Sequence, residues 1–573
     1  MNEIPTIITE RVDDIPLLLE QMQRMGLPTL LDTHFPAHGT WTGLSLGWVS
    51  TIWLSSILSQ GDHRMVHVEP WVAKRLWTLG TTTGQMVTRV DFTDDRLESV
   101  LRRLRHDERW GAFESGLHQH TVRVYALSPE RVHVDSTSAK AYATVSDGGL
   151  FQFGHSKDYR PDLPQVKVMQ AVLDPLGMPL ATDVVSGERA DAPLSMPCIE
   201  RVQASVGRHG LLYVGDCKMA SRETRARLMA LGDFYLCSLS QVQLAAGEVD
   251  TALETVWRGE QVLSAVRREG PKGEREVIAE GYEYPVAMSQ QVGEQVQTWT
   301  ERRLVVRSVR QAYAAEVALR ARVAKAIAQI DALNQRGRGK KRFETVSALR
   351  QAVVAIVQGY GVENLLWFRL TQHVTPRQVR AYRGQPARVD HDRHATVEVC
   401  VDDAALEAAV RRLGWRVYGT NQPAESLSLE QAVLAYRNEY QVERSLGRLK
   451  GRPLSLTPMY VQRDDHATGL IRLLSIALRV LTLLEFVGRR QLAAGGTKLA
   501  GLYAGNPRRE TARPTAEHLL KAFEDITLTI VKGSQRIVRH MTALSPLQQC
   551  ILALLGFSPE LYTRLGTISS EPP

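Results

Sequence analysis

Residues 130–240 constrain the fold most, because strand-like and helix-like patterns alternate there and two of the strands lead into an aspartate. In RVHVDST, Val132 and Val134 alternate with polar neighbours and bring Asp135 to a strand end. In LLYVGD, an apolar run ends on Asp216. The end of an apolar strand is a costly place for an anion unless something pairs with it, so we expect both carboxylates to line a cleft.

The order of elements around these aspartates predicts a mixed α/β sheet with helices on its faces. The segment VKVMQAVLDPLGMPLATDVVSG is typical of a hairpin whose strands join at Pro175 to Gly177. A helix is expected at about residues 193–207, before the strand that leads into Asp216. The helical pattern SRETRARLMAL and the strand pattern DFYLCSLS follow.

A third carboxylate lies far along the chain, in the helical segment AYRNEYQVERSLGRLKG. Helix positions seven apart lie within about 20° of one another, so Tyr436, Glu443 and Lys450 form one stripe. Ser428 and Gln431 offer a capping box for the helix that carries Glu443. Three remote acidic groups in such contexts are able to meet around divalent metal.

Length and charge set broad limits. The 573 residues are enough for roughly three to four domains. Lys and Arg number 70 against 62 acidic residues, which gives a net charge of +8 and favours a polyanionic partner. A moderately basic enzyme without such a partner has the same charge balance.

Several features favour a reducing, cytoplasmic setting. The amino terminus has acidic residues where a secretory signal would need a basic start and an apolar core. The apolar segment GLIRLLSIALRVLTLLEFVG contains Arg472 and Arg479, which predicts a buried or DNA-facing helix and no membrane span. We expect these two arginines to share a face and to contact DNA. The cysteines contain no CxxC pair, which argues against a zinc ribbon or a disulfide framework: Cys198, Cys217, Cys237, Cys400 and Cys550.

The patterns divide the chain into five parts. Residues 1–128 and 491–573 are predicted to be helical, and residues 129–240 and 411–490 to form the two parts of the core. Residues 241–410 are too long for a connection and predict a structured insertion. Within it, RGRGKKRF is a basic loop that either clamps DNA or forms a solvated turn.

Phosphoryl transfer on a nucleic-acid backbone is the chemistry that three such carboxylates suit. Two divalent ions about 4 Å apart activate an attacking oxygen and stabilise the leaving one. Magnesium prefers oxygen ligands and keeps several waters, so three acidic side chains suffice.

Four segments of the sequence resemble a known protein family. YRNEYQVERSLGRLKGRPLSLTP is similar to the carboxy-terminal Tyr-Arg-Glu-Lys signature of bacterial insertion-sequence DDE transposases, with matching positions Tyr436, Glu439, Glu443 and Lys450. VHVDSTSAKAY, GHSKDYRPDLPQ and YVGDCKMASRE resemble the blocks around the two catalytic aspartates of that family. The four blocks fall in the family's order and cover about residues 85–490.

The resemblance implies a ribonuclease-H-like catalytic core with a β-rich insertion between the second Asp and the Glu. It implies that Asp135, Asp216 and Glu443 are the catalytic residues and hold Mg²⁺, for which Mn²⁺ substitutes. Lys450 and Tyr436 become contacts to the DNA backbone. The family also implies binding of terminal inverted repeats by the amino-terminal region, target DNA as a second partner, and a homodimer assembled on DNA ends in the bacterial cytoplasm.

Four further residues are candidate DNA contacts. Lys157 and Arg160 follow the first strand, where a loop meets a scissile strand, and Arg444 lies beside the stripe. Trp415 is a candidate for stacking on an extruded base, as in related transposases that form hairpin ends, although a core role is the commoner one for tryptophan.

The sequence departs from the signature at Glu439, where the family often has Arg. Glu439 and Glu443 are four apart on one helical face, where like charges repel, so we expect a surface role for Glu439.

The predicted function is that of a cut-and-paste transposase. A domesticated DNA-binding protein that has lost catalysis is the alternative, and the three intact acids speak against it. A glycosidase needs two carboxylates with aromatic platforms, whereas aromatic residues make up only 6% of the chain.

Overall fold

A nine-stranded mixed sheet is the centre of the computed structural model, which describes residues 5–37, 39, 41–270, 273–337, 339–381, 386–533 and 537–566. The sheet order is β4-β3-β2-β5-β6-β12-β9-β8-β7. The strands β2, β5 and β6 run parallel, and the other neighbours pair antiparallel. The strands are β4 (Met178–Ser186), β3 (Gln165–Leu173), β2 (Arg131–Lys140), β5 (Leu212–Gly215), β6 (Phe234–Leu239), β12 (Trp415–Thr420), β9 (Gln295–Ser308), β8 (Arg275–Val292) and β7 (Ser264–Glu269).

The mixed α/β prediction is confirmed, and the predicted hairpin is the pair β3 and β4. One local prediction was wrong: Asp135 lies in the middle of β2 and not at its end. The strand continues to Lys140 because residues 136–140 stay in register with the start of β3, where Lys140 pairs with Gln165. The polar residues Ser136 and Ser138 are buried in this extension, which hydropathy alone does not reveal.

Helices cover both faces of the sheet. α8 (Ser195–Val206) and α9 (Arg222–Ala230) lie on one face, and α14 (Leu429–Arg437) and α15 (Tyr440–Lys450) lie on the other. The capping box of Ser428 and Gln431 starts α14 as predicted. The predicted single helix is, however, interrupted at residues 438–439. The two helices pack on different strands, α14 on β5 to β8 and α15 on β2 and β3, so the helix axis changes direction there.

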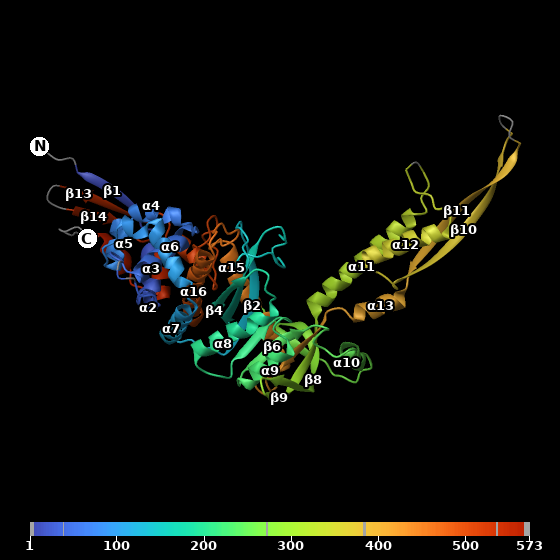
Figure 1. The fold of residues 1–573 in the computed structure, drawn as a ribbon, viewed down its shortest axis with the longest axis horizontal. Coiled ribbons are helices and arrows are strands. Elements are labelled where there is room, and N and C mark those ends of the chain that lie inside the picture. The colour runs from blue at the N-terminus through green and yellow to red at the C-terminus, as the bar shows by residue number, and fades with distance from the viewer. Residues whose placement is uncertain are drawn as a thin grey trace.

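The two ends of the chain form one helical body beside the sheet (Figure 1). Its strand β1 (Thr6–Arg11) pairs with β13 (Thr527–Lys532), which pairs with β14 (Ile537–Met541), so neither terminal region is purely helical. Its amino-terminal helices are α1 (Ile15–Arg24), α2 (Leu27–His34), α3 (Leu46–Gln60), α4 (Val68–Ala73), α5 (Leu76–Thr83), α6 (Asp94–Leu104) and α7 (Asp107–Tyr125). Its carboxy-terminal helices are α16 (Asp464–Ala494), α17 (Ala516–Lys521), α18 (Pro546–Leu555) and α19 (Glu560–Thr563).

Helix α16 contains the most apolar segment of the tail and is buried along most of its length. It contacts α6, α3 and α18 in the helical body and β4 of the sheet, and so connects the two. Among the described residues, no helix combines the length and the low charge that crossing a membrane requires.

The predicted insertion, residues 241–410, contributes to two parts of the structure. After α10 (Glu248–Trp257), the strands β7, β8 and β9 extend the central sheet. The remainder projects as an arm with its own hydrophobic core (Figure 1). The arm consists of α11 (Val309–Ala332), α12 (Val346–Tyr360), the two-stranded ribbon β10 (Leu366–Val379) and β11 (Arg388–Val401), and α13 (Asp403–Arg411).

Candidate active site

Asp135 and Asp216 lie side by side on neighbouring parallel strands. Val134 of β2 is in register with Gly215 of β5, so the next residue of each strand is an aspartate. Adjacent strands lie about 4.8 Å apart, so the two backbones are close. Both residues share the strand face on which α14 packs against Val214, because side chains alternate along a strand.

The surroundings of Asp135 combine burial with cations. Its Oδ1 accepts a hydrogen bond from the Ser136 amide at 2.7 Å and lies 3.6 Å from Nζ of Lys157. Burial raises the pKa of Asp135 above its ordinary value, and Asp216 adds to the increase. Lys157, the Ser136 amide and Lys218 act in the opposite direction. The buried carboxylate of Asp135 is therefore stabilised by the nearby ammonium groups of Lys157 and Lys218.

Asp216 is fixed by the turn that follows β5. Its Oδ1 accepts a hydrogen bond from the Lys218 amide at 2.9 Å. The side chain of Lys218 makes an ion pair with Asp191, which also accepts from Lys167 at 2.7 Å. These contacts fix the positions of the cations around the acid pair. Within the described residues, the carboxylate of Asp216 itself makes no ion pair.

Helix α15 lies over the same part of β2 and β3. Gln170 is opposite Asp135 in the β2–β3 register, and its Oε1 accepts a hydrogen bond from Ser445 at 2.9 Å. Val442 and Leu446 pack on Val172. The predicted third acid therefore belongs to a helix that is docked next to the aspartates.

Glu443 lies within α15 and Glu439 directly precedes it, and the two glutamates have different environments. Glu443 is exposed, whereas Glu439 is half-buried. Burial, together with the negative charges of Asp135, Asp216 and Glu443, raises the pKa of Glu439 to about 7, and a hydrogen bond with Tyr436 acts in the opposite direction. Glu439 is thus a neighbour of the acid pair, a position that the expected surface role did not foresee.

The donor set suits a hard cation at Asp135 and Asp216. Two close carboxylates offer oxygen ligands of the kind that magnesium takes, and magnesium retains waters in its remaining positions. Among the described residues, no group of three or more His, Cys, Asp or Glu side chains is close enough to hold a metal ion. Glu443 therefore lies outside the aspartate pair in this arrangement.

Lys450 and Tyr436, the predicted DNA contacts of the stripe, are both engaged within the protein. Lys450 donates to Oγ1 of Thr137 at 3.3 Å and makes an ion pair with Asp158. The hydroxyl of Tyr436 shares a hydrogen bond with the hydroxyl of Ser238 at 3.1 Å, and its ring packs against Tyr418. Lys450 lies close to the acid site, whereas Tyr436 is mainly a core side chain here.

The other predicted cations differ in availability. Lys157 contacts Asp135, whereas Arg160 is half-buried and paired with Asp162. Arg444 makes hydrogen bonds of 2.9 and 2.7 Å to the buried carboxylate of Glu485. Arg444 therefore helps to join α15 to α16.

The expectation that Arg472 and Arg479 contact DNA was wrong. Both side chains are buried at 3% exposure. Arg472 donates to the carbonyls of residues 104 and 105 and pairs with Asp107, and Arg479 bonds Glu114 at 2.6 Å and two carbonyls of β4. A guanidinium has five N–H donors, and both arginines donate to acceptors inside the protein.

Trp415 lies at a small pocket next to the second aspartate. Its indole donates to the carbonyl of Arg411 at 3.0 Å, and the ring is half-buried. The pocket has a volume of about 340 Å³, and its wall includes Trp415, Arg416, Leu239, Ser238 and Cys217, which directly follows Asp216. An aromatic ring, apolar walls and a nearby guanidinium are the components of a site for a nucleobase.

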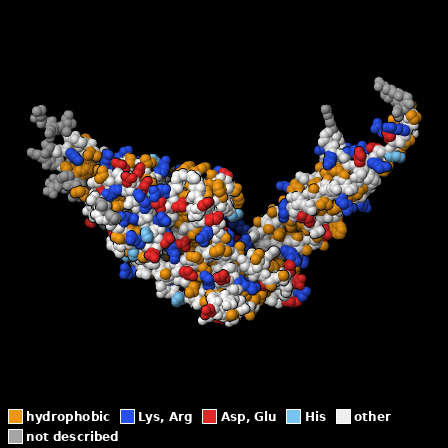
Figure 2. Space-filling view, viewed as in Figure 1, with side chains coloured by type: hydrophobic (Ala, Val, Ile, Leu, Met, Phe, Trp, Pro, Cys, Tyr) orange, Lys and Arg blue, Asp and Glu red, His pale blue; other side chains and the backbone are white. Residues whose placement is uncertain are grey.

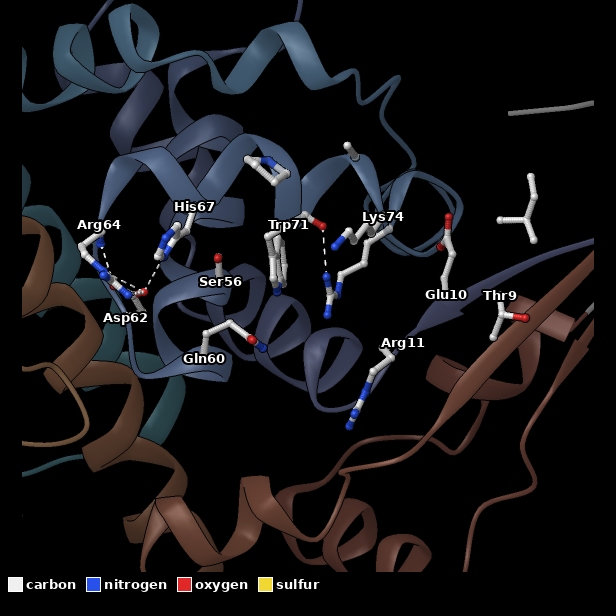
Figure 3. A pocket seen from close by; sticks show the side chains of 14 residues that line it. Thr9, Glu10, Arg11, Ser56, Gln60, Asp62, Arg64, His67, Trp71 and Lys74 are labelled. Carbon is white, nitrogen blue, oxygen red and sulfur yellow. Dashed lines mark hydrogen bonds and ion pairs between the residues drawn. The ribbon is translucent and has the colours of Figure 1, made fainter.

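A second cavity, of about 750 Å³, lies in the helical body between β1, α3 and α4 (Figure 3). Its acids are satisfied locally: Glu10 accepts from the backbone of Trp77 and Thr78, and Asp62 pairs with Arg64 and His67. Its lining also includes the basic residues Arg11, Lys74 and Arg75. The cavity is a basic feature of the region predicted to bind inverted repeats.

Comparison with known proteins gives a match to a family and, among solved structures, a weak likeness. The sequence model described as "Transposase DDE domain" matches residues 127–480. No curated protein matches the chain. A cryo-EM structure of the piggyBac transposase synaptic complex with hairpin DNA is 7% identical over 96% of this chain and 83% of that chain, with a TM-score of 0.33, too low to support an argument.

Proposed function

Because the chain belongs to the transposase DDE domain family, whose sequence model matches residues 127–480, we propose that it is the DNA transposase of an insertion sequence. It binds terminal inverted repeats, hydrolyses a phosphodiester at each element end, and joins the freed 3′ hydroxyl to target DNA. The observation that carries the proposal is the register of Val134 with Gly215, which sets Asp135 beside Asp216 on one strand face.

The catalytic roles fall on Asp135, Asp216 and Glu443. The aspartates hold Mg²⁺, or Mn²⁺ in its place, and Glu443 joins them when DNA is bound and α15 adjusts over the sheet. When bound, the metal supplies Lewis acidity for phosphodiester hydrolysis and strand transfer by the two-metal route. Lys157 and Lys218 balance the charge of the aspartates in the free protein.

The remaining proposed DNA contacts surround this site. Lys450 and Lys157 reach phosphates next to the acids, and Arg160 reaches them from its exposed loop. Arg444 and Tyr436 retain a proposed role that requires exchange of their internal partners for DNA. The pocket of Trp415 accepts a base that leaves the duplex stack.

The sheet supports a ribonuclease-H-like core. The strand order β4-β3-β2-β5-β6 is compatible with that fold. In it, β4, β3 and β2 pair antiparallel, and β2, β5 and β6 pair parallel. The helical body binds the inverted repeats, using the basic cavity between β1, α3 and α4. Two protomers assemble on paired DNA ends in the bacterial cytoplasm, where the nucleoid supplies the target.

A domesticated DNA-binding protein without catalysis is the second proposal, and retention of all three acids argues against it. The two differ in one experiment. Purified protein is incubated with candidate element ends and Mg²⁺, and 3′ hydroxyl termini are scored. The transposase produces them at the element boundary, whereas a domesticated protein shifts the DNA in a gel and leaves it intact.

A further inference from the structure

We propose that the outer part of the arm is a second DNA-binding site, which contacts the phosphate backbone of duplex DNA away from the catalytic acids. This site, called the arm patch below, consists of the loop at residues 334–337 and 339–345 and of the ribbon of β10 and β11, residues 366–381 and 386–401. The inference rests on the proposed function, because it names a further contact with the same class of partner.

The arm patch concentrates the charge of the chain. Its described residues contain nine Lys and Arg residues against four Asp and Glu, a net charge of +5, whereas the whole chain has +8. The rest of the protein therefore carries a net charge of only +3. Clustering of basic residues on one projecting element is the electrostatic feature expected of a nucleic-acid contact.

The basic loop is docked on the ribbon, so its charges add to those of the strands. The carbonyl of Phe343 accepts from the Ala395 amide at 2.8 Å, and that of Glu344 accepts from Gln372 at 2.8 Å. Asn334 bonds both backbone groups of Val397, at 2.7 and 2.9 Å. The structure thus combines the RGRGKKRF motif, of which Arg338 lies outside the described residues, with the strand cations.

Three of the four acids of the patch have ion-pair partners, whereas most of its cations do not. Arg369 pairs with Glu398, Arg388 with Asp390, and Arg342 with Asp392. Six other cations make no ion pair within the described part of the chain: Arg336, Lys340, Lys341, Arg377, Arg380 and Arg393. The uncompensated charge is therefore positive. Figure 2 shows Lys and Arg side chains distributed along the arm.

Two histidines of the ribbon lie in the same positive electrostatic potential. His373 and His394 are opposite one another in the ribbon, and their rings stack with centroids 4.8 Å apart. Loss of hydration lowers the pKa of His394, and the positive charges of Arg336, His373 and Arg342 lower it further. Asp392 acts in the opposite direction, so the nearby positive charges add to the effect of lost hydration but are partly offset.

The ribbon extends well beyond its support. Val397 and Ala395 pack in the core of the arm, whereas Val374 and Val389, nearer the tip, are 52% and 54% exposed. Strands of 14 residues reach roughly 45 Å, and an isolated two-stranded ribbon is marginally stable in water. The major groove of DNA admits a two-stranded ribbon, and phosphates flank that groove.

Duplex DNA fits the arm patch better than a second copy of this chain. Another arm would bring the same excess of positive charge, and like charges repel. The phosphates of DNA supply the opposite charge at regular spacing along a rod, which matches an elongated basic surface.

The test compares two full-length charge variants on a duplex long enough to span body and arm. Arg336→Gln, Lys340→Gln and Lys341→Gln together remove three exposed cations of the arm patch. The control combines Lys498→Gln, Arg508→Gln and Arg513→Gln, three exposed cations of the carboxy-terminal region without ion pairs in the described residues. Unchanged thermal unfolding of both variants excludes misfolding.

Binding is followed by fluorescence anisotropy over a range of salt concentrations. The arm variant is expected to reduce the slope of log K against log salt by about two to three units, because about 0.9 unit is lost per phosphate contact. The control is expected to keep the slope of the unmodified protein. Equal slopes for the two variants would overturn the proposal.

Two further measurements distinguish this proposal from a protein–protein interface and from the proposed catalytic function. Sedimentation of the protein without DNA detects a change in self-association. If the salt slopes were equal and self-association changed, the arm would be assigned to a protein interface. Asp135→Asn is expected to abolish strand cleavage and keep the salt slope. Full cleavage by Asp135→Asn would reject the catalytic assignment and leave the arm patch supported by its own binding data.

Discussion

Nζ of Lys157 lies 3.6 Å from Oδ1 of Asp135, although the two residues are separated by 22 positions and by the loop after β2. Asp135 is adjacent to Asp216 through strand register, so this ammonium group faces a site where two carboxylates meet. The contact connects the loop GHSKDYRPD to the acid pair. Lys157 is therefore the cation best placed to respond when a phosphate approaches.

Lys157→Met is expected to slow strand cleavage by at least about tenfold, which corresponds to about 1.4 kcal/mol of barrier. The substitution removes the cation next to Asp135 and a phosphate contact. Arg258→Gln is the matched control, because Arg258 is exposed, already paired with Glu254, and not among the proposed DNA contacts. Single-turnover cleavage of an element end measures both. A loss in Arg258→Gln as large as that in Lys157→Met would contradict the role given to Lys157.

Lys450→Gln is expected to weaken binding to element ends and to reduce its salt slope by roughly one unit, because one phosphate contact is lost. In the free protein Lys450 is paired with Asp158, so DNA has to replace that carboxylate. Lys498→Gln removes a cation far from the acids in sequence and serves as the control. An identical slope for the two variants would reject the contact.

Glu485→Gln is expected to lower the free energy of unfolding by about 3–5 kcal/mol, because it removes the buried anion that three arginines share. Glu485 is 3% exposed and pairs with Arg444, Arg448 and Arg489. The control is Glu254→Gln, whose partner Arg258 is exposed, and its effect is expected to stay within about 0.5 kcal/mol. Urea unfolding measures both, and similar effects would show that the cluster does not stabilise α15 against α16.

Asp191 predicts a specific dependence of stability on pH. Burial acts to raise its pKa, but hydrogen bonds from Lys167 and Lys218 lower it to about 2. Because the folded pKa lies below the unfolded value of about 3.9, the stabilisation is present above about pH 4 and is lost as the pH falls towards 2.

The variant Asp191→Asn is therefore expected to be less stable than the unmodified protein near neutral pH. The difference in unfolding free energy should shrink between about pH 4 and pH 2. Urea unfolding at several pH values measures it. A difference that stayed constant over that range would show that the carboxylate of Asp191 is not the cause.

Local patterns predicted the elements that carry Asp135 and Asp216, because apolar strands next to acids are visible in a short window. The register of β2 with β5 is a tertiary property, and no local pattern gives it. Strand β1 was missed for a similar reason: its partner, β13, lies more than 500 residues away in the sequence. Its short alternation in TIITER is weak without that partner.

Buried charges were the hardest features to predict. Arg472 and Arg479 interrupt an apolar run, which favoured contact with DNA, yet their partners Asp107 and Glu114 lie on α7, far away in sequence. Glu439 was assigned to the surface because it repels Glu443 on a regular helix. The interruption at residues 438–439 changes the helix direction and brings Glu439 close to both aspartates, a consequence of packing on two sets of strands.

Cleavage of an element end in Mg²⁺ by four single variants tests the central claim most directly. Asp135→Asn, Asp216→Asn and Glu443→Gln should each yield no 3′ hydroxyl termini while binding the inverted repeat normally. Glu439→Gln, one helical turn before Glu443, should retain cleavage. The account would be contradicted if Glu443→Gln still cleaved the DNA while Glu439→Gln did not, because the third acid would then be the residue beside the aspartate pair in the free protein.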